Sequence, residues 1–186
     1  MSGIVNAKAL EEKRIFLVLS SPAHARERDI EIIKEISSLG YHTIIISTNF
    51  PYSILIKLYR DAGVDPGSVS FIDSVTRTSI GHAEDIPGVV HFINNPGDLT
   101  DLGIAVTEAL KDQSGKKVCI LYDSISTMLI YLSSANISKF IHFVTNKLRL
   151  MRFSGIFIVV EKGLDPDVLT QLTMFVDTVI DMDKNS

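Results

Sequence analysis

Short, continuous apolar runs alternate along this chain with longer stretches in which apolar residues recur at helical spacing. The clearest runs are residues 15–19, 118–122 and 156–160. They lack the alternation of apolar and polar positions that is typical of half-exposed strands, and this favours strands buried on both faces. Strands separated by amphipathic helices predict βαβ units with right-handed crossovers. We therefore expect an α/β fold of three layers, α/β/α, with a mostly parallel central sheet and these three runs inside it.

Weaker signals complete this prediction. Further strands are expected at residues 43–47, 69–72, 89–93 and 176–182. Helices are expected within residues 30–39, 51–63, 98–110, 126–132, 137–153 and 165–173. The stretch 73–88 has no clear period, so it is predicted to be irregular, with room for one short strand. We expect one domain over residues 14–186, preceded by an N-terminal extension of residues 1–13.

The composition favours a single globular domain and argues against several other classes of protein. The chain has 186 residues, of which 46% are hydrophobic, and this is enough for a single well-packed domain. Cys119 alone cannot form a disulfide framework. The net charge of −4 argues against nucleic acid as a partner. No apolar run reaches the ~20 residues of a membrane span, and the N-terminus lacks the apolar stretch of a signal peptide. We therefore expect a cytoplasmic protein with no membrane partner.

Asp123 is the most informative polar residue, because it directly follows the apolar run 118–122. A carboxylate at the end of a core strand is where a Walker-B aspartate orients Mg²⁺ in phosphoryl-transfer enzymes. Asp123 and Ser124 can equally serve as caps for the helix that follows. This segment alone leaves both interpretations open.

The order and spacing of five segments resemble the RecA-like ATPase core, in particular its KaiC-like branch. The longest begins VCILYDSIS and continues to residue 163. The others are YHTIIISTNFP, SVSFID, NPGDLTDLGIAVTEAL and FVDTVIDMD, so the resemblance covers residues 14–183. It implies a RecA-like central sheet. Because RecA-like domains usually work as rings or filaments, it also implies self-association or a protein partner.

The first loop departs from the family's phosphate-binding loop, G-x-x-x-x-G-K-[ST]. In the best alignment, Ser20 and Ala25 take the glycine positions, Arg26 takes the lysine and Glu27 takes the Ser/Thr. Glycine allows backbone N–H groups to wrap phosphates in conformations that other residues resist. A carboxylate about 4 Å from a phosphate costs about 4 kcal/mol at an effective dielectric near 20. If a nucleotide binds nevertheless, the resemblance implies contacts from Ser21, His24, Ala25, Arg26, Glu27, Asp123 and Ser124, with Asp123 as the metal ligand.

The second departure follows the run 43–47. KaiC-like proteins usually place acidic residues there, one of which activates water, whereas this chain has Asn49 and Phe50, neither of which is a general base. The favoured hypothesis is a catalytically inactive RecA/KaiC-like domain that acts as a binding, assembly or regulatory module, with no catalytic residues and no cofactor. The alternative is a nucleotide-binding KaiC-like ATPase with an atypical phosphate loop, which would use Arg26, Asp123 and Mg-ATP.

Two further groups of charged residues stand out in the sequence. Lys147, Arg149 and Arg152 form a basic cluster near a helix end, which is more typical of a solvated face than of a nucleic-acid patch. Glu161 and Lys162 follow a core strand, where they could be a relic of a nucleotide-sensing element or a surface ion pair.

Overall fold

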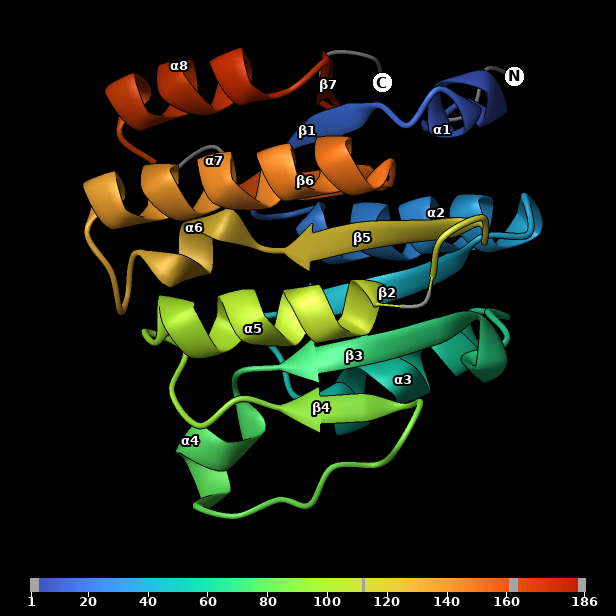
Figure 1. Cartoon of the computed structure of the whole chain (residues 1–186), viewed down its shortest axis with the longest axis vertical. Helices are drawn as coiled ribbons and strands as arrows, with labels where there is room; N and C mark the ends of the chain where they lie inside the picture. Colours follow the sequence, from blue (N-terminus) through green and yellow to red (C-terminus); the bar gives the residue numbers. More distant parts are fainter. Residues whose placement is uncertain (1–3, 112, 161–163, 184–186) are drawn as a thin grey trace.

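The computed structural model describes residues 4–111, 113–160 and 164–183. Its strands form one sheet in the order β4-β3-β2-β5-β6-β1-β7, and every pairing between them is parallel (Figure 1). The strands are β1 (Ile15–Ser20), β2 (His42–Ser47), β3 (Val69–Asp73), β4 (Val90–Phe92), β5 (Val118–Asp123), β6 (Ser154–Val160) and β7 (Thr178–Asp181). The predicted α/β class and central parallel sheet are confirmed.

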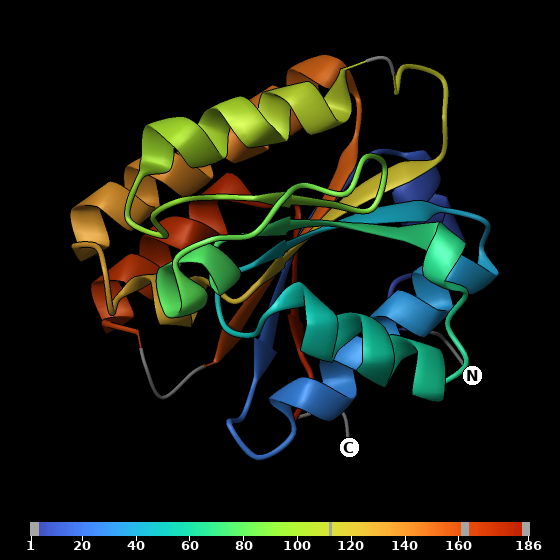
Figure 2. The ribbon, with the colours of Figure 1, turned by 90° about the horizontal axis from the view of Figure 1, so that it is seen from below.

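Helices cover both faces of the sheet, so that three layers result (Figure 2). α1, α2 and α3 pack on one face, and α5, α7 and α8 pack on the other. The helices are α1 (Ala7–Glu11), α2 (Ala25–Ser38), α3 (Tyr52–Asp61), α4 (Thr76–Ile80), α5 (Leu99–Leu110), α6 (Ile125–Met128), α7 (Ser134–Met151) and α8 (Pro166–Phe175), with a 3₁₀ turn η1 (Pro66–Ser68). Among the described helices, none is both long and apolar enough to cross a membrane.

The three clearest apolar runs lie inside the sheet, as predicted. β5 lies between β2 and β6, β6 between β5 and β1, and β1 between β6 and β7. Successive side chains of β5 enter opposite cores: Ile120 and Tyr122 pack toward α5 and α7, while Cys119 and Leu121 pack toward α2 and α3. A strand buried on both faces needs apolar residues at every position, and this produces the continuous runs.

Two segments differ from the prediction. The stretch 73–88, expected to be irregular, contains α4. The carboxylate of Asp73 accepts hydrogen bonds from the backbone N–H groups of Val75 and Thr76, and this starts the helix. The helix is too short to show a helical period of apolar residues in the sequence. The helix expected over 126–132 ends at Met128, and α7 begins anew after Ser133, whose hydroxyl accepts from the N–H of Asn136. Within the expected N-terminal extension, α1 places Leu10 in the core beside α2.

Candidate functional site

The candidate site lies at the carboxyl edge of the sheet, where β1, β2 and β5 end beside the start of α2. The register pairs Ser47, the last residue of β2, with Asp123, the last residue of β5. Thr48 continues this pairing, because its N–H donates to the carbonyl of Asp123 at 2.9 Å. In open parallel sheets, ligands bind outside the carboxyl ends of the strands, and helix N-termini there favour anions.

The loop between β1 and α2 is a tight turn whose backbone groups bond to one another. The carbonyl of Ser21 accepts from the N–H groups of His24 and Ala25 at 3.2 and 3.1 Å. The N–H of Ser21 donates to the Oδ2 atom of Asp183 at 2.5 Å, and His24 Nδ1 lies 3.6 Å from the other oxygen of that carboxylate. Three backbone N–H groups of the loop are therefore already paired within the protein.

The guanidinium of Arg26 points across the site. Its Nη1 atom lies 3.8 Å from the Oδ2 atom of Asp123 and 3.8 Å from the Oδ2 atom of Asp29. Its guanidinium carbon lies 3.9 Å from the centre of the Phe50 ring, which is cation–π geometry. The residue aligned with the phosphate-loop lysine is thus held by two carboxylates and one aromatic ring of this chain.

Asp29 and Tyr59 complete the cluster, and the sequence reasoning missed both. Asp29 is 1% exposed, and its Oδ2 atom accepts a hydrogen bond from the Tyr59 hydroxyl of α3 at 2.7 Å. A signal for Asp29 exists in the sequence, because it precedes Ile32, Ile33 and Ile36 by three, four and seven residues. It therefore lies on the apolar stripe of α2, where an unpaired carboxylate would be costly.

Burial sets the electrostatics of this cluster. It raises the pKa of Asp123, and Arg26 lowers that pKa in part. Burial and the neighbouring Asp123 raise the pKa of Asp29 well above its ordinary value, against the opposing effects of Tyr59 and Arg26. Burial also raises the pKa of Tyr59, so this phenol remains a hydrogen-bond donor. The guanidinium of Arg26 is therefore the neighbouring positive charge of two carboxylates, and burial disfavours the ionised form of each.

Neither the Asp123 nor the Ser124 side chain caps α6, contrary to the capping interpretation. Ser124 stands at the N-cap of α6, but its side chain makes no capping hydrogen bond there. Its hydroxyl lies 3.0 Å from the hydroxyl of Thr127. The Oδ2 atom of Asp123 is buried and has no hydrogen-bond partner among the described residues. The Asp123 carboxylate therefore faces Arg26 and not the helix.

The structure brings only part of the predicted set together. Arg26 and Asp123 meet directly, whereas Ser21 and His24 contact Asp183, and Glu27 is exposed in the first turn of α2. Glu161 and Lys162 lie outside the described residues. Among the described residues, no three His, Cys, Asp or Glu side chains gather in a way that could hold a metal ion.

Two residues of the basic cluster near the end of α7 contact other residues of this chain. Arg149 forms an ion pair with Asp177 at 2.8 Å and also donates to the carbonyl of Phe175. Lys147 lies over the ring of Phe143, with its ammonium 5.5 Å from the ring centre. The charge of Arg149 is thus compensated within the protein.

Solved structures share this fold at low sequence identity. An uncharacterized protein of Pyrococcus horikoshii, in complex with an unknown peptide, matches with a TM-score of 0.68 and 15% identity over 91% of this chain and 77% of its own. A KaiC-like protein of the same organism matches with a TM-score of 0.62 and 12% identity over 91% of this chain and 72% of its own. The flagellar accessory protein FlaH of Methanocaldococcus jannaschii matches with a TM-score of 0.53 and 12% identity over 91% of this chain and 71% of its own.

These likenesses establish the RecA/KaiC-like fold and nothing finer. The comparison with curated protein sequences gives no match. One family model, described as a family of unknown function (DUF7504), matches residues 13–182. Because that match covers most of the sequence, the chain belongs to this family.

Proposed function

We propose that this protein is a RecA/KaiC-like domain that does not hydrolyse ATP and that acts as a protein-binding or assembly module. The observation that carries the proposal is the position of Arg26. A phosphate-loop cation must face the β- and γ-phosphates, but this guanidinium lies between Asp29 and Asp123 and is stacked on Phe50. The charge of Arg26 is already compensated within the protein, so a nucleotide would have to displace these contacts before Arg26 could bind its phosphates.

The first loop supports the proposal independently. A phosphate cradle needs several backbone N–H groups that point outward and are free to donate. In this loop, the N–H groups of Ser21, His24 and Ala25 are paired with Asp183 and with the carbonyl of Ser21. Glu27 adds a negative charge to the first turn of α2, which a phosphate would approach. These three donors of the loop are therefore not free to bind an anion, and the charge of Glu27 opposes one.

The residues present do not fit Mg-nucleotide. In P-loop enzymes the metal is held by a Ser/Thr hydroxyl of the loop and by the Walker-B carboxylate. Glu27 replaces that hydroxyl, and a guanidinium nitrogen lies 3.8 Å from the Oδ2 atom of Asp123, so this carboxylate already has a positively charged neighbour. Asn49 and Phe50 supply no base for the attacking water. Binding, metal activation and proton abstraction are each impaired, and hydrolysis requires all three.

The protein-binding half of the proposal draws on the fold neighbours and on the surface. One neighbour was crystallised with an unknown peptide. In this chain several large apolar side chains are exposed, among them Ile104, Ile130 and Leu150. Exposed apolar side chains that gather into a patch are typical of sites that bind other proteins. A domain that does not hydrolyse ATP could still bind other proteins through these exposed apolar side chains.

A thermal-shift titration with ATP, ADP and GTP, each with Mg²⁺, tests the inactive-site proposal. Ligand at 100 times its dissociation constant adds about 2.7 kcal/mol to the free energy of unfolding. For a domain of this size that would raise Tm by roughly 2–4 °C per kcal/mol. We expect no rise at millimolar nucleotide and an ATP hydrolysis rate equal to that of a protein-free blank. A rise of several degrees that disappears in Asp123→Asn would overturn the proposal in favour of an active nucleotide site.

A further inference from the structure

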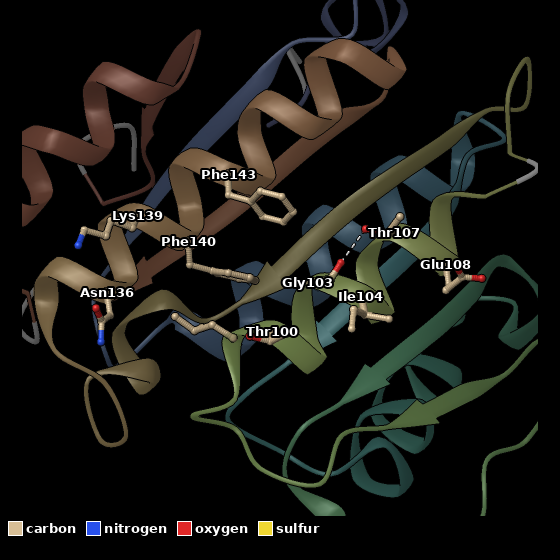
Figure 3. A pocket seen from close by; sticks show the side chains of 10 residues that line it. Thr100, Gly103, Ile104, Thr107, Glu108, Asn136, Lys139, Phe140 and Phe143 are labelled. Carbon is tan, nitrogen blue, oxygen red and sulfur yellow. Dashed lines mark hydrogen bonds between the residues drawn. The ribbon is translucent and has the colours of Figure 1, made fainter.

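An apolar groove of ≈ 590 Å³ lies between α5 and α7, on the face of the sheet opposite α2 and α3 (Figure 3). Phe140 and Phe143 contribute its aromatic side, and Ile104 and Thr107 line it from α5. Neither helix contributes a residue to the cluster around Arg26. The groove is therefore a separate feature from the candidate nucleotide site.

α5 carries a glycine, Gly103, where it passes the ring of Phe143. A Cβ added at Gly103 would lie 3.4 Å from the Cε1 atom of Phe143, in van der Waals contact, so the glycine leaves this side of the ring uncovered. Thr107 donates its hydroxyl to the carbonyl of Gly103 at 2.7 Å, drawn as the dashed line in Figure 3. That hydroxyl is satisfied within the helix and demands no partner from an incoming surface.

The same surface carries the side chains that would fill such a groove. Ile104, the neighbour of Gly103 in sequence, is 57% exposed, and Phe143 is 45% exposed. Each copy thus carries an exposed apolar side chain next to an apolar groove. A surface with both features is complementary to a second copy of itself. Under a two-fold axis, the same patch on two copies makes both contacts at once.

Charge completes this self-complementarity. Lys139 lies at one end of the groove and Glu108 at the other (Figure 3). A two-fold axis through the middle of the groove brings Lys139 of one copy to Glu108 of the other, twice per dimer. The charges beside these two residues are arranged in the same way. Lys111 lies 3.8 Å from Glu108, and Asp98 caps α5 at the end nearer Lys139. The same two-fold axis would bring Lys111 of one copy to Asp98 of the other.

We propose that the α5–α7 groove is the contact surface for a second copy of this chain, in an antiparallel two-fold dimer with Ile104 of each copy in the groove of the other. This names the partner for the assembly role proposed above and rests on that role. The patch is only two helices wide, so the interface falls in the small size class. We therefore expect a weak, concentration-dependent dimer, with a dissociation constant of the order of micromolar.

Sedimentation velocity on the whole chain, from roughly 5 to 500 µM, tests the proposal in the range expected for a small interface. Wild-type protein should shift from monomer toward dimer across that range. Glu108→Lys and Lys139→Glu should each raise the dissociation constant about tenfold or more, since each reverses two contacts per dimer. Ile104→Ser should have a similar effect through loss of the inserted side chain. Lys57→Glu on α3, an exposed lysine of the opposite layer, is the matched control and should leave the dimer unchanged.

The decisive sample is an equimolar mixture of Glu108→Lys and Lys139→Glu. In the mixed dimer every end contact again joins opposite charges, so association should return to about the wild-type level, as it should in the double variant alone. A protein that stays monomeric across the range, a dimer that ignores both charge reversals, or a mixture that fails to associate would each overturn the proposal. Nucleotide binding in the thermal-shift experiment would leave this result untouched, so the two proposals fail separately.

Discussion

Asp73 and Asp123 occupy equivalent places in this fold, yet their surroundings differ completely. Each is the last residue of a parallel strand, and each is buried. Both pair in register with Ser47, Asp73 from β3 on one side and Asp123 from β5 on the other. Sequence position and burial alone therefore do not distinguish them.

Hydrogen bonding distinguishes them. The Asp73 carboxylate accepts from the N–H groups of Tyr52, Val75 and Thr76 and from the Thr76 hydroxyl, all between 2.6 and 2.9 Å. The Oδ2 atom of Asp123 accepts no hydrogen bond among the described residues and faces Arg26 at 3.8 Å. Asp73 ties the starts of α3 and α4 to the sheet, whereas Asp123 has a charge partner without a hydrogen bond. The bonds of Asp73 indicate a structural role, whereas Asp123, held only by a neighbouring cation, belongs to the candidate site.

Removing the bonded carboxylate should have the largest effect. Asp73→Ala leaves three backbone N–H groups without their acceptor, and hydrogen bonds to charged groups contribute about 1.5–3 kcal/mol each. We expect the free energy of unfolding to fall by about 3–5 kcal/mol, measured by urea denaturation. Asp73→Asn keeps one carbonyl oxygen and should cost clearly less. A loss below 1 kcal/mol in Asp73→Ala would contradict the structural role.

Removing the cation from the candidate site should cost less. Arg26→Met leaves Asp29 and Asp123 without a counter-charge and removes the contact with Phe50. Because the Arg26 side chain is partly exposed, we expect a loss of about 2 kcal/mol at pH 7. Adding Asp123→Asn should recover part of it, since one buried charge disappears. If the double variant is as unstable as the sum of the two single variants, Arg26 and Asp123 are not coupled.

The contrast between the two aspartates also marks what the sequence could predict. The interior strands follow from continuous apolar runs, and the position of Asp123 follows from its place after residues 118–122. The hydrogen bond of Asp29 does not follow, because Tyr59 reaches it from thirty residues away, through the packing of α3 against α2. The pairing of Ser21 with Asp183 depends in the same way on β7 lying beside β1. Local patterns predict elements, whereas side-chain partners across the edge of a sheet depend on topology.

The buried acidic pair should also give the protein a specific pH dependence. The folded-state pKa values of Asp29 and Asp123 are raised above the ordinary value of 3.8, so the folded protein holds protons that the unfolded chain has released. The stabilising contribution is therefore fully present below pH ~3.8 and is lost as pH rises through the folded-state pKa values.

Asp29→Asn tests this dependence, because the amide oxygen can still accept from Tyr59 while one titrating group is removed. Relative to wild type, the variant should gain stability as pH rises from about 4.5 to 7.5, measured by denaturant unfolding. His42, whose pKa is lowered by burial, contributes a slope of opposite sign, but it is common to both proteins and cancels in the difference. A constant difference across this range would show that Asp29 does not titrate in it.

The smallest expected effect is the return of nucleotide binding. The triple variant Ala25→Gly, Arg26→Lys and Glu27→Thr restores three residues of the phosphate-loop pattern, and it removes the guanidinium from Asp123 and the negative charge from the first turn of α2. Two obstacles remain, because Ser21 stays bonded to Asp183 and the loop keeps its tight turn. We therefore expect weak binding only, visible as a Tm rise of roughly 2–4 °C at millimolar Mg-ATP, about 1 kcal/mol of ligand stabilisation. Adding Asp123→Asn to the triple variant should abolish the rise. A folded triple variant with no response would mean that the loop backbone, and not its side chains, excludes the nucleotide.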